Sequence, residues 1–269
     1  MHGKDATIRQ KFQSRYGEWA VITGASSGIG RALALRVAQY GLNTLLVARN
    51  ATALKELQSE IEQNYQVKSA VLPLDLASDP TEELIARVQD KKVGLLIASA
   101  GFGTSGYFTE SSIYEEVNML EVNCRALLEL THYFARHFSK QQRGGIILLS
   151  SMVGFQGVPY TAHYAATKAY VQSLAEGLYH ELKEQKVAIL AAAPGPVATG
   201  FASRANMVMD GAMDPAHISE EILKALGRKM TVLPGLLTKV LVYSLRTVPR
   251  WGKIRIMQLV MSGMTKHQR

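Results

Sequence analysis

The stretch Trp19-Ala-Val-Ile-Thr-Gly-Ala-Ser-Ser-Gly-Ile-Gly30 joins an apolar run of strand length to a glycine-rich turn. Gly24, Gly28 and Gly30 follow a G-x-x-x-G-x-G spacing, and helical periodicity starts directly after them, at Arg31. Glycines at a strand-to-helix turn let the backbone approach a pyrophosphate, which binds at the positive end of the helix. An ordinary glycine-rich turn is the alternative. The position between the first strand and the first helix favours a dinucleotide site.

The alternation of strand and helix continues along the chain. Further apolar runs of strand length lie at residues 44–48, 70–74, 95–98, 145–150, 188–193 and 230–234, and helix-length segments such as 31–40 and 55–64 separate them. Short apolar strands between helices predict a parallel sheet covered on both faces, and right-handed crossovers make it doubly wound. Because no Pro-, Gly- or Ser-rich linker interrupts the series, we predict an α/β protein with one Rossmann-like domain over residues 1–269.

The composition, with 47% hydrophobic and 19% charged residues, is typical of a soluble globular protein. A single cysteine, Cys124, excludes an internal disulfide and a cysteine-based metal cluster, and the seven histidines show no ligand spacing, so we expect no metal. The first residues are polar, and no stretch reaches the roughly 18 uncharged apolar residues of a spanning helix. We therefore expect a location in the cytoplasm or on a surface that faces it.

The net charge of +8 is unevenly distributed. Residues 1–221 hold 20 Lys and Arg against 22 Asp and Glu, whereas residues 222–269 hold 10 Lys and Arg and no acid. The basic character therefore belongs to the C-terminal segment. A near-neutral body argues against a nucleic-acid partner.

The end of the second strand indicates which dinucleotide binds. NAD sites place an acid there for the ribose 2′-hydroxyl, but this sequence has Ala48 followed by Arg49. A guanidinium can bind a 2′-phosphate through two hydrogen bonds, and Ser26 and Ser27 could add hydroxyl donors. A solvated surface arginine is the alternative. We predict NADP(H) as the cofactor.

A tyrosine and a lysine four residues apart, Tyr164 and Lys168, would share one face of a helix. A free phenol has a pKa of about 10. We expect the nearby ammonium to lower the pKa of Tyr164 toward the working range, so that the phenol can exchange a proton with a carbonyl or alcohol oxygen. This pair alone is weak evidence, because many helices contain it by chance.

Several further motifs accompany the pair. They are Thr23–Gly30 (TGASSGIG), Asp75 within Leu74-Asp75-Leu76, Asn123 within Glu121-Val-Asn-Cys124, Ser151 thirteen residues before Tyr164, and Pro194-Gly-Pro-Val-Ala-Thr199. On these motifs, in this order over about residues 17–200, the sequence resembles the short-chain dehydrogenase/reductase superfamily.

The resemblance implies four catalytic residues. Ser151 would hydrogen-bond the substrate oxygen, and Tyr164 would exchange the proton. Lys168 would also bind the nicotinamide ribose, and Asn123 would hold a water molecule in the proton relay. Ser151 as a strand-end cap and Asn123 as an ordinary buried amide are the alternatives.

The resemblance also implies the cofactor site. Its residues would be Gly24, Ser26, Ser27, Gly28, Ile29, Gly30, Arg49, Asp75, Leu76, Ala100, Gly101, Tyr164, Lys168, Pro194, Gly195, Val197 and Thr199. Asp75 would contact the adenine, and Thr199 with the backbone of Val197 would orient the carboxamide. The sequence departs from the family in having Ala98-Ser-Ala-Gly101 for Asn-Asn-Ala-Gly, for which we expect altered local hydrogen bonding. It also lacks the Asp-Gly-Gly ending of many tetramers. We expect a homodimer or homotetramer.

Residues 201–228 occupy the position of the family's variable substrate lid. Apolar residues are frequent in this segment and in the loops that would face it: Phe201, Met207, Val208, Met209 and Met213, with Phe102, Phe155 and Val158. Flexible thioethers suit an adaptable apolar pocket, which predicts a hydrophobic carbonyl or alcohol substrate. Packing in the core is the alternative.

The basic C-terminal extension, residues 236–269, mixes apolar residues with lysines and arginines. Such a segment could cover the cleft, pack against another subunit or lie on an anionic membrane surface. Overall the sequence predicts an NADP(H)-dependent oxidoreductase that acts mainly as a ketone or aldehyde reductase. The alternative is a non-catalytic NADPH sensor or scaffold, but such proteins typically lose the Ser, Tyr or Lys that this chain retains. The substrate itself stays open.

Overall fold

The computed structural model describes residues 2–209 and 211–268. All its named strands belong to one parallel sheet with the order β3-β2-β1-β4-β5-β6-β7. The strands are β1 (Trp19–Thr23), β2 (Asn43–Ala48), β3 (Ser69–Pro73), β4 (Val93–Ala98), β5 (Gly144–Leu149), β6 (Val187–Ala192) and β7 (Thr231–Val232). Each predicted strand lies within two residues of an observed one. The α/β class and the doubly wound sheet are confirmed.

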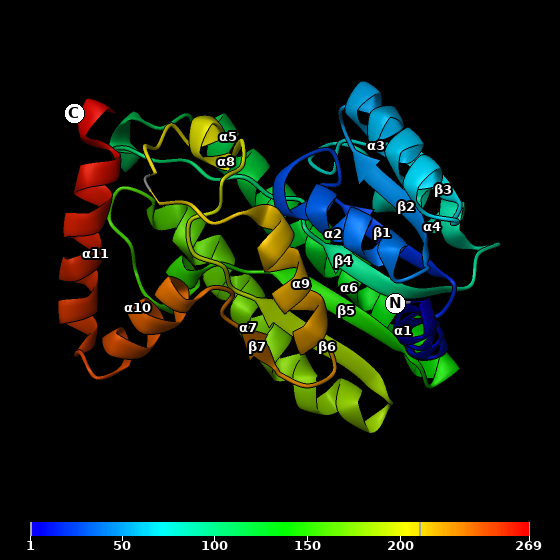
Figure 1. Ribbon diagram of the computed structural model, residues 1–269. Coiled ribbons are helices and arrows are strands. Elements are labelled where there is room, and N and C mark those ends of the chain that lie inside the picture. Colours follow the sequence, from blue (N-terminus) through cyan, green and yellow to red (C-terminus); the bar gives the residue numbers. More distant parts are fainter. Residues whose placement is uncertain (1, 210, 269) are drawn as a thin grey trace.

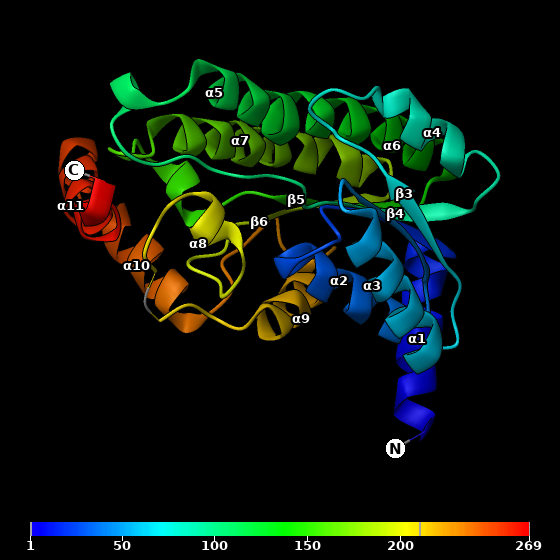
Figure 2. The same ribbon diagram turned by 90° about the horizontal axis from the view of Figure 1, so that it is seen from above.

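Helices flank the sheet on both faces (Figures 1 and 2). They are α1 (His2–Tyr16), α2 (Gly28–Gln39), α3 (Ala51–Asn64), α4 (Thr81–Val88), α5 (Ile113–Leu120), α6 (Leu127–Gln141), α7 (Ala162–Glu184), α8 (Phe201–Arg204), α9 (Pro215–Ala225), α10 (Leu236–Arg246) and α11 (Arg250–Met264). Seen from above in Figure 2, α4 to α7 lie on one side of the sheet, and α2, α3 and α9 lie on the other.

Successive strand residues point to opposite faces and fill two separate cores. In β1, Ile22 packs in the core beneath α2, α3 and α9, whereas Val21 packs in the core beneath α4, α6 and α7. Both side chains are fully buried. Burial on both faces explains why the strands read as continuous apolar runs in the sequence.

The strand order reverses between β1 and β4, which makes this position the switch point of the sheet. The Thr23 hydroxyl, at the end of β1, accepts hydrogen bonds from the backbone amides of Ser99 and Ala100, both at 3.1 Å. These bonds hold together the two loops that leave the carboxyl ends of β1 and β4. Ligands of doubly wound folds bind in the crevice at this place.

The segment predicted as a lid, residues 201–228, has two different parts. Helix α9 packs along α2, and its Ile218 and Ile222 belong to the main core. Met213 also contacts this core, so its assignment to the substrate pocket is wrong: its side chain packs beside Gly235 and against the core. Within the described part of this segment, α8 and residues 205–209 do not belong to the cores of the sheet, and we keep the term lid for them.

Candidate active site

The three glycines of the turn each lie where a side chain would collide. A Cβ on Gly30 would lie 2.2 Å from the Gly24 carbonyl oxygen, and one on Gly24 would lie 2.8 Å from the Ala100 backbone. Gly28 has φ +55°, and a Cβ there would lie 2.9 Å from the Thr199 side chain. The turn therefore packs tightly against the loops after β4 and β6, which brings the predicted pyrophosphate and nicotinamide sites together.

Helix α2 begins at Gly28, directly on this turn. Its N-cap, Ser27, makes no side-chain capping bond to the described part of the chain. Ser27 is exposed, while Ser26 and Ile29 are half-buried beside it. The first amides of the helix can thus bind an anion, and the helix dipole favours a negative charge at this end.

Arg49 follows β2, as predicted, and its side chain is 64% exposed. Its guanidinium lies 3.7 Å from an Asp75 carboxylate oxygen, a pairing that the sequence alone did not indicate. Asn50 caps α3 by accepting a 3.1 Å hydrogen bond from the Ala53 amide. The partial pairing leaves guanidinium donors of Arg49 available for a second anion.

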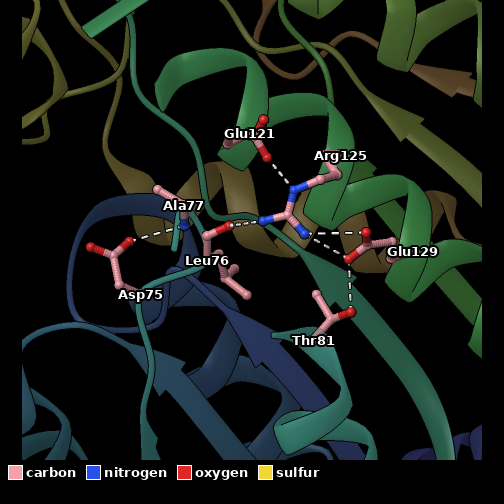
Figure 3. Close-up of polar contacts among 7 residues, drawn as sticks. All are labelled: Asp75, Leu76, Ala77, Thr81, Glu121, Arg125 and Glu129. Carbon is pink, nitrogen blue, oxygen red and sulfur yellow. Dashed lines mark hydrogen bonds and ion pairs between the residues drawn. The ribbon is translucent and has the colours of Figure 1, made fainter. Parts of the chain in front are cut away.

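A cluster centred on Arg125 fixes the loop that carries Asp75 and Leu76 (Figure 3). The Arg125 guanidinium donates to the Leu76 carbonyl at 3.3 Å, contacts Glu121, and binds both carboxylate oxygens of Glu129 at 3.0–3.1 Å. The Asp75 carboxylate accepts from the Ala77 amide at 3.0 Å. Arg125 thus links the adenine-side loop to the helix that also carries Asn123, a role that we did not predict from the sequence.

Ser151 and Tyr164 come together at the carboxyl end of β5. The Ser151 hydroxyl lies close enough to the phenol of Tyr164 to lower its pKa. Tyr164 is buried, and its ring lies 5.2 Å from that of Phe201 in the lid. Lys168, one turn further along α7, is also buried and donates a 2.8 Å hydrogen bond to the Leu149 carbonyl. The structure therefore brings the predicted triad of side chains into one place.

The surroundings of Ser151, Tyr164 and Lys168 correct the expectation that the pKa of Tyr164 is lowered. Burial raises the pKa of Tyr164 well above its usual value, and the Ser151 hydroxyl only partly opposes this effect. Burial also lowers the pKa of Lys168 to about 8. The Lys168 ammonium lies 5.8 Å from the centre of the phenol ring and is held by a carbonyl. We expected Lys168 to lower the pKa of Tyr164, but desolvation dominates and the phenol stays protonated at neutral pH.

Asn123 is fully buried in a π-helical turn, Glu121–Ala126, which interrupts the helix between α5 and α6. Its amide donates to the Phe102 carbonyl at 2.9 Å and to the Thr167 hydroxyl at 3.0 Å, and its oxygen accepts from the Phe102 amide at 3.1 Å. A Cβ on Gly101 would lie 2.9 Å from this oxygen and 3.3 Å from the Lys168 nitrogen. Asn123 therefore joins the loop after β4 to α7 beside Lys168.

The predicted nicotinamide loop, Pro194–Thr199, leaves β6 next to the catalytic trio. The Pro194 carbonyl accepts a 3.0 Å hydrogen bond from the Met152 amide, and Val197 pairs with Met213. A Cβ on Gly195 would lie 2.6 Å from the Thr238 hydroxyl of α10. The C-terminal extension therefore supports this loop from behind.

The apolar residues predicted to line a substrate pocket pack largely with one another and with α11. Met207 and Met209 pack with Val158, but also with Met257 and Met261 of α11. Arg204 of α8 lies over the Phe102 ring at 4.8 Å and pairs with Glu115 at 2.8 Å. Phe155 packs instead in a small core beside α10. The inner face of α11 thus packs against the lid.

Beside Tyr164, the half-buried His163 pairs with the buried Glu116, a contact that the sequence did not predict. The His163 imidazole lies 2.6 Å from a carboxylate oxygen of Glu116, which is 4% exposed, and Thr104 donates to the other oxygen at 2.9 Å. A cavity of about 200 Å³ adjoins the pair and Tyr160. The pair ties α5 to the start of α7, so we interpret it as positioning Tyr164.

The family follows from a comparison of this geometry and sequence with known proteins. The family model described as short chain dehydrogenase matches residues 18–209. The chain belongs to this family. It is 31% identical over 234 residues to a 7beta-hydroxysteroid dehydrogenase of Clostridium sardiniense, covering 85% of this chain and 89% of the relative.

Two further members of this family are instructive. A very-long-chain 3-oxoacyl-CoA reductase of Meyerozyma guilliermondii is 36% identical over 189 residues, covering 66% of this chain and 55% of the relative. The solved structure of a short-chain dehydrogenase from Sphingobium yanoikuyae in complex with NADPH has a TM-score of 0.79 and 29% identity, covering 87% of this chain and 93% of that chain. This short-chain dehydrogenase is therefore an oxidoreductase that uses a nicotinamide cofactor and acts on CH–OH or C=O groups.

Proposed function

We propose that this short-chain dehydrogenase transfers hydride between NADP(H) and a hydrophobic carbonyl/alcohol pair, mainly as a ketone or aldehyde reductase. The observation that carries the proposal is the placement of the Ser151 hydroxyl beside the buried Tyr164, with the buried Lys168 one helical turn away. Preorganised donors in a desolvated site stabilise charge that develops on a substrate oxygen.

The residues present fit a dinucleotide. The glycine turn leaves no room for side chains beside the first amides of α2, and such a cradle suits a pyrophosphate. The exposed Arg49 suits a 2′-phosphate, and no acid stands at the end of β2. A similar family member is known as an NADPH complex. These observations support NADP(H) over NAD(H), with Asp75, Leu76, Ala100, Gly101 and Thr199 lining the rest of the site.

Each catalytic side chain has a definite task in this proposal. NADPH, when bound, supplies the hydride. A phenol with an ordinary pKa of about 10 is protonated at neutral pH, and burial raises the pKa of Tyr164 further, so its hydroxyl carries the proton that the carbonyl oxygen accepts. The Ser151 hydroxyl stabilises the resulting phenolate and the substrate oxygen. Lys168 adds a cation nearby, and Asn123 holds the loop and helix that border the site.

The substrate class follows from the lid. Tyr164 faces the Phe201 ring, and apolar side chains of the lid and of α11 surround it. The two named relatives are a hydroxysteroid dehydrogenase and a very-long-chain 3-oxoacyl-CoA reductase, which supports a hydrophobic carbonyl. A sensor or scaffold role is disfavoured because the Ser, Tyr and Lys are all present and packed together.

A homodimer or homotetramer remains our prediction for the assembly. Helix α5 exposes Ile113, Tyr114 and Val117 next to the acidic Glu115. Exposed apolar and aromatic side chains are typical of contacts between like subunits. Sedimentation velocity of the wild type and of Ile113→Ser would measure the assembly, and a wild-type monomer would contradict the prediction.

The substitution Tyr164→Phe tests the proposed function. It removes only the hydroxyl, so we expect turnover of carbonyl compounds to fall about 10³- to 10⁴-fold while NADPH affinity changes by less than about threefold. NADPH absorbance would follow turnover, and fluorescence titration would measure binding. Turnover within about tenfold of the wild type would refute the assignment of Tyr164.

A further inference from the structure

The helices α10 and α11 carry a second apolar surface, away from the catalytic site. Both figures place these two helices together at the end of the molecule opposite α3 and α4 (Figures 1 and 2). We call their exposed apolar side chains the C-terminal face: Leu236, Leu237, Val240, Tyr243, Trp251, Ile256, Leu259 and Val260. Trp251 is 76% exposed and Leu236 is 77% exposed. Exposed apolar side chains in this number on two neighbouring helices are typical of a binding surface.

The charge on these helices has a single sign. Residues 222–269 contain no Asp or Glu. Lys239 pairs with Glu221 at 3.0 Å, whereas Arg246, Arg250 and Lys253 form no ion pair within the described residues. Their positive charges lie beside the exposed apolar side chains and are available to an anionic partner.

The opposite side of α11 is firmly docked, so the exposure of the outer side is not due to loose folding. Met257 and Met261 are buried against the lid. The Met264 carbonyl accepts a 3.0 Å hydrogen bond from the Val208 amide, and Gln268 donates to the Ser105 hydroxyl at 2.8 Å. The helix therefore presents one apolar side to the protein and a second apolar side to its surroundings.

We propose that the C-terminal face docks on the surface of an anionic bilayer. An amphipathic helix with lysines, arginines and a tryptophan among apolar residues binds at the boundary of headgroups and acyl chains. Each Lys or Arg near an anionic surface adds to the affinity, and the apolar side chains supply the rest. Among the described residues, none of the helices combines the length and apolar character needed to cross a bilayer.

A second copy of the chain fits this face less well. A two-fold interface sets the same patch against itself, so the unpaired cations of both copies would meet. Like charges facing each other across an interface cost several kcal/mol. The charge therefore selects an anionic partner for the C-terminal face.

The docking would place the lid next to the bilayer, because α11 covers the lid from the same end. A hydrophobic substrate could then pass from the membrane to the cleft. This consequence rests on the proposed function, but the docking itself does not, because binding requires no turnover.

Flotation with vesicles tests the docking. We expect the wild type to float with vesicles of equal parts phosphatidylcholine and phosphatidylglycerol, but not with phosphatidylcholine alone. Binding should weaken when the salt rises from about 0.05 to 0.5 M, because salt screens surface charges. Tyr164→Phe should float like the wild type, so a failure of the catalytic proposal would remain distinguishable from a failure of docking.

Two pairs of substitutions with equal charge change give the control. Each basic residue near the surface is worth about fivefold in binding, so Arg250→Gln with Lys253→Gln should lower the partition coefficient about 25-fold. Lys55→Gln with Arg87→Gln, on α3 and α4 at the other end, should change it less than about twofold. Trp251 emission should shift to the blue on anionic vesicles, and Trp251→Phe should abolish the shift.

Three results would overturn the docking proposal. The first is a wild type that does not float with anionic vesicles. The second is an equal loss of binding in both double variants, which would show attraction by net charge alone. The third is a lower molecular mass for Leu259→Ser than for the wild type in sedimentation, which would show that a second copy covers the face.

Discussion

The cofactor and catalytic region, about residues 17–200, and the C-terminal extension, residues 236–268, use apolar and charged residues in opposite ways. In the first region Tyr164, Lys168 and Asn123 are buried, and the side chains of Lys168 and Asn123 are held by hydrogen bonds. In the extension, large apolar side chains and unpaired cations are exposed. Chemistry needs groups that are held in place before the substrate arrives, whereas a docking surface needs groups that remain accessible.

We expect the largest effect from Gly30→Ala, a substitution that breaks the close packing of the first region. Gly30→Ala would put a methyl group about 2.2 Å from the Gly24 carbonyl oxygen, so the turn must open. We expect kcat/KM for NADPH to fall about 10³-fold. Gly177→Ala in α7 is the matched control, since its Cβ would meet nothing within 4 Å. It should stabilise the protein by about 0.5–1 kcal/mol. NADPH use by Gly30→Ala within tenfold of wild type would contradict the assigned role of the turn.

We expect the next largest effect from a substitution of Arg49, an exposed charge in the predicted cofactor site. Arg49→Asp exchanges the predicted 2′-phosphate ligand for an acid, and we expect kcat/KM for NADPH to fall about 10²-fold. The value for NADH should stay the same or rise, because the 2′-hydroxyl can pair with a carboxylate. Steady-state kinetics with both cofactors provide the measurement. An unchanged ratio of the two values would show that Arg49 is only a surface residue.

The sequence predicted the parts of the first region that depend on local pattern. Continuous apolar runs locate the strands because both faces of the sheet are covered, and β1 was predicted without error. The glycine turn and the spacing of Ser151, Tyr164 and Lys168 are local in the same sense. Their clustering follows from the sheet, because all of them lie at the carboxyl ends of strands or in the helix that follows.

Contacts between distant segments could not be predicted in this way. Glu116 and His163 are 47 residues apart, and Arg125 and Leu76 are 49 apart, so no spacing rule links them. The pKa of Tyr164 was misjudged for a related reason. Spacing shows that Lys168 is near, but only the packed structure shows how far both groups are desolvated.

A titration would sharpen the contrast between the buried ammonium of the site and the exposed cations of the extension. The pKa of Lys168 is lowered from 10.5 to about 8, so the unfolded state binds more protons between these values and stability rises with pH. Tyr164→Phe removes the phenol titration. We compare Tyr164→Phe with the double variant that also carries Lys168→Met. Between pH 8 and 10 we expect the unfolding free energy of the single variant to rise by about 1 kcal/mol per pH unit more than that of the double variant. Equal pH dependence in urea unfolding would contradict the burial of a charged Lys168.

We expect the smallest effect from Met261→Ala, and its comparison with Leu46→Ala tests whether the extension unfolds separately from the sheet. Leu46 belongs to one of the two cores of the sheet, whereas Met261 packs in a separate cluster. Leu46→Ala should lower the free energy of global unfolding by about 3 kcal/mol. Met261→Ala should lower it by less than about 1 kcal/mol, because α11 can undock while the sheet stays folded.

Hydrogen exchange would show that undocking directly. The Val208 amide donates to the Met264 carbonyl, so its exchange should accelerate in Met261→Ala while the amides of β1 and β4 keep their protection. Leu46→Ala should accelerate the exchange of both. If Met261→Ala instead destabilised the sheet as much as Leu46→Ala, the extension and the catalytic region would form one cooperative unit. Membrane docking of α11 would then act on the whole enzyme and not on the lid alone.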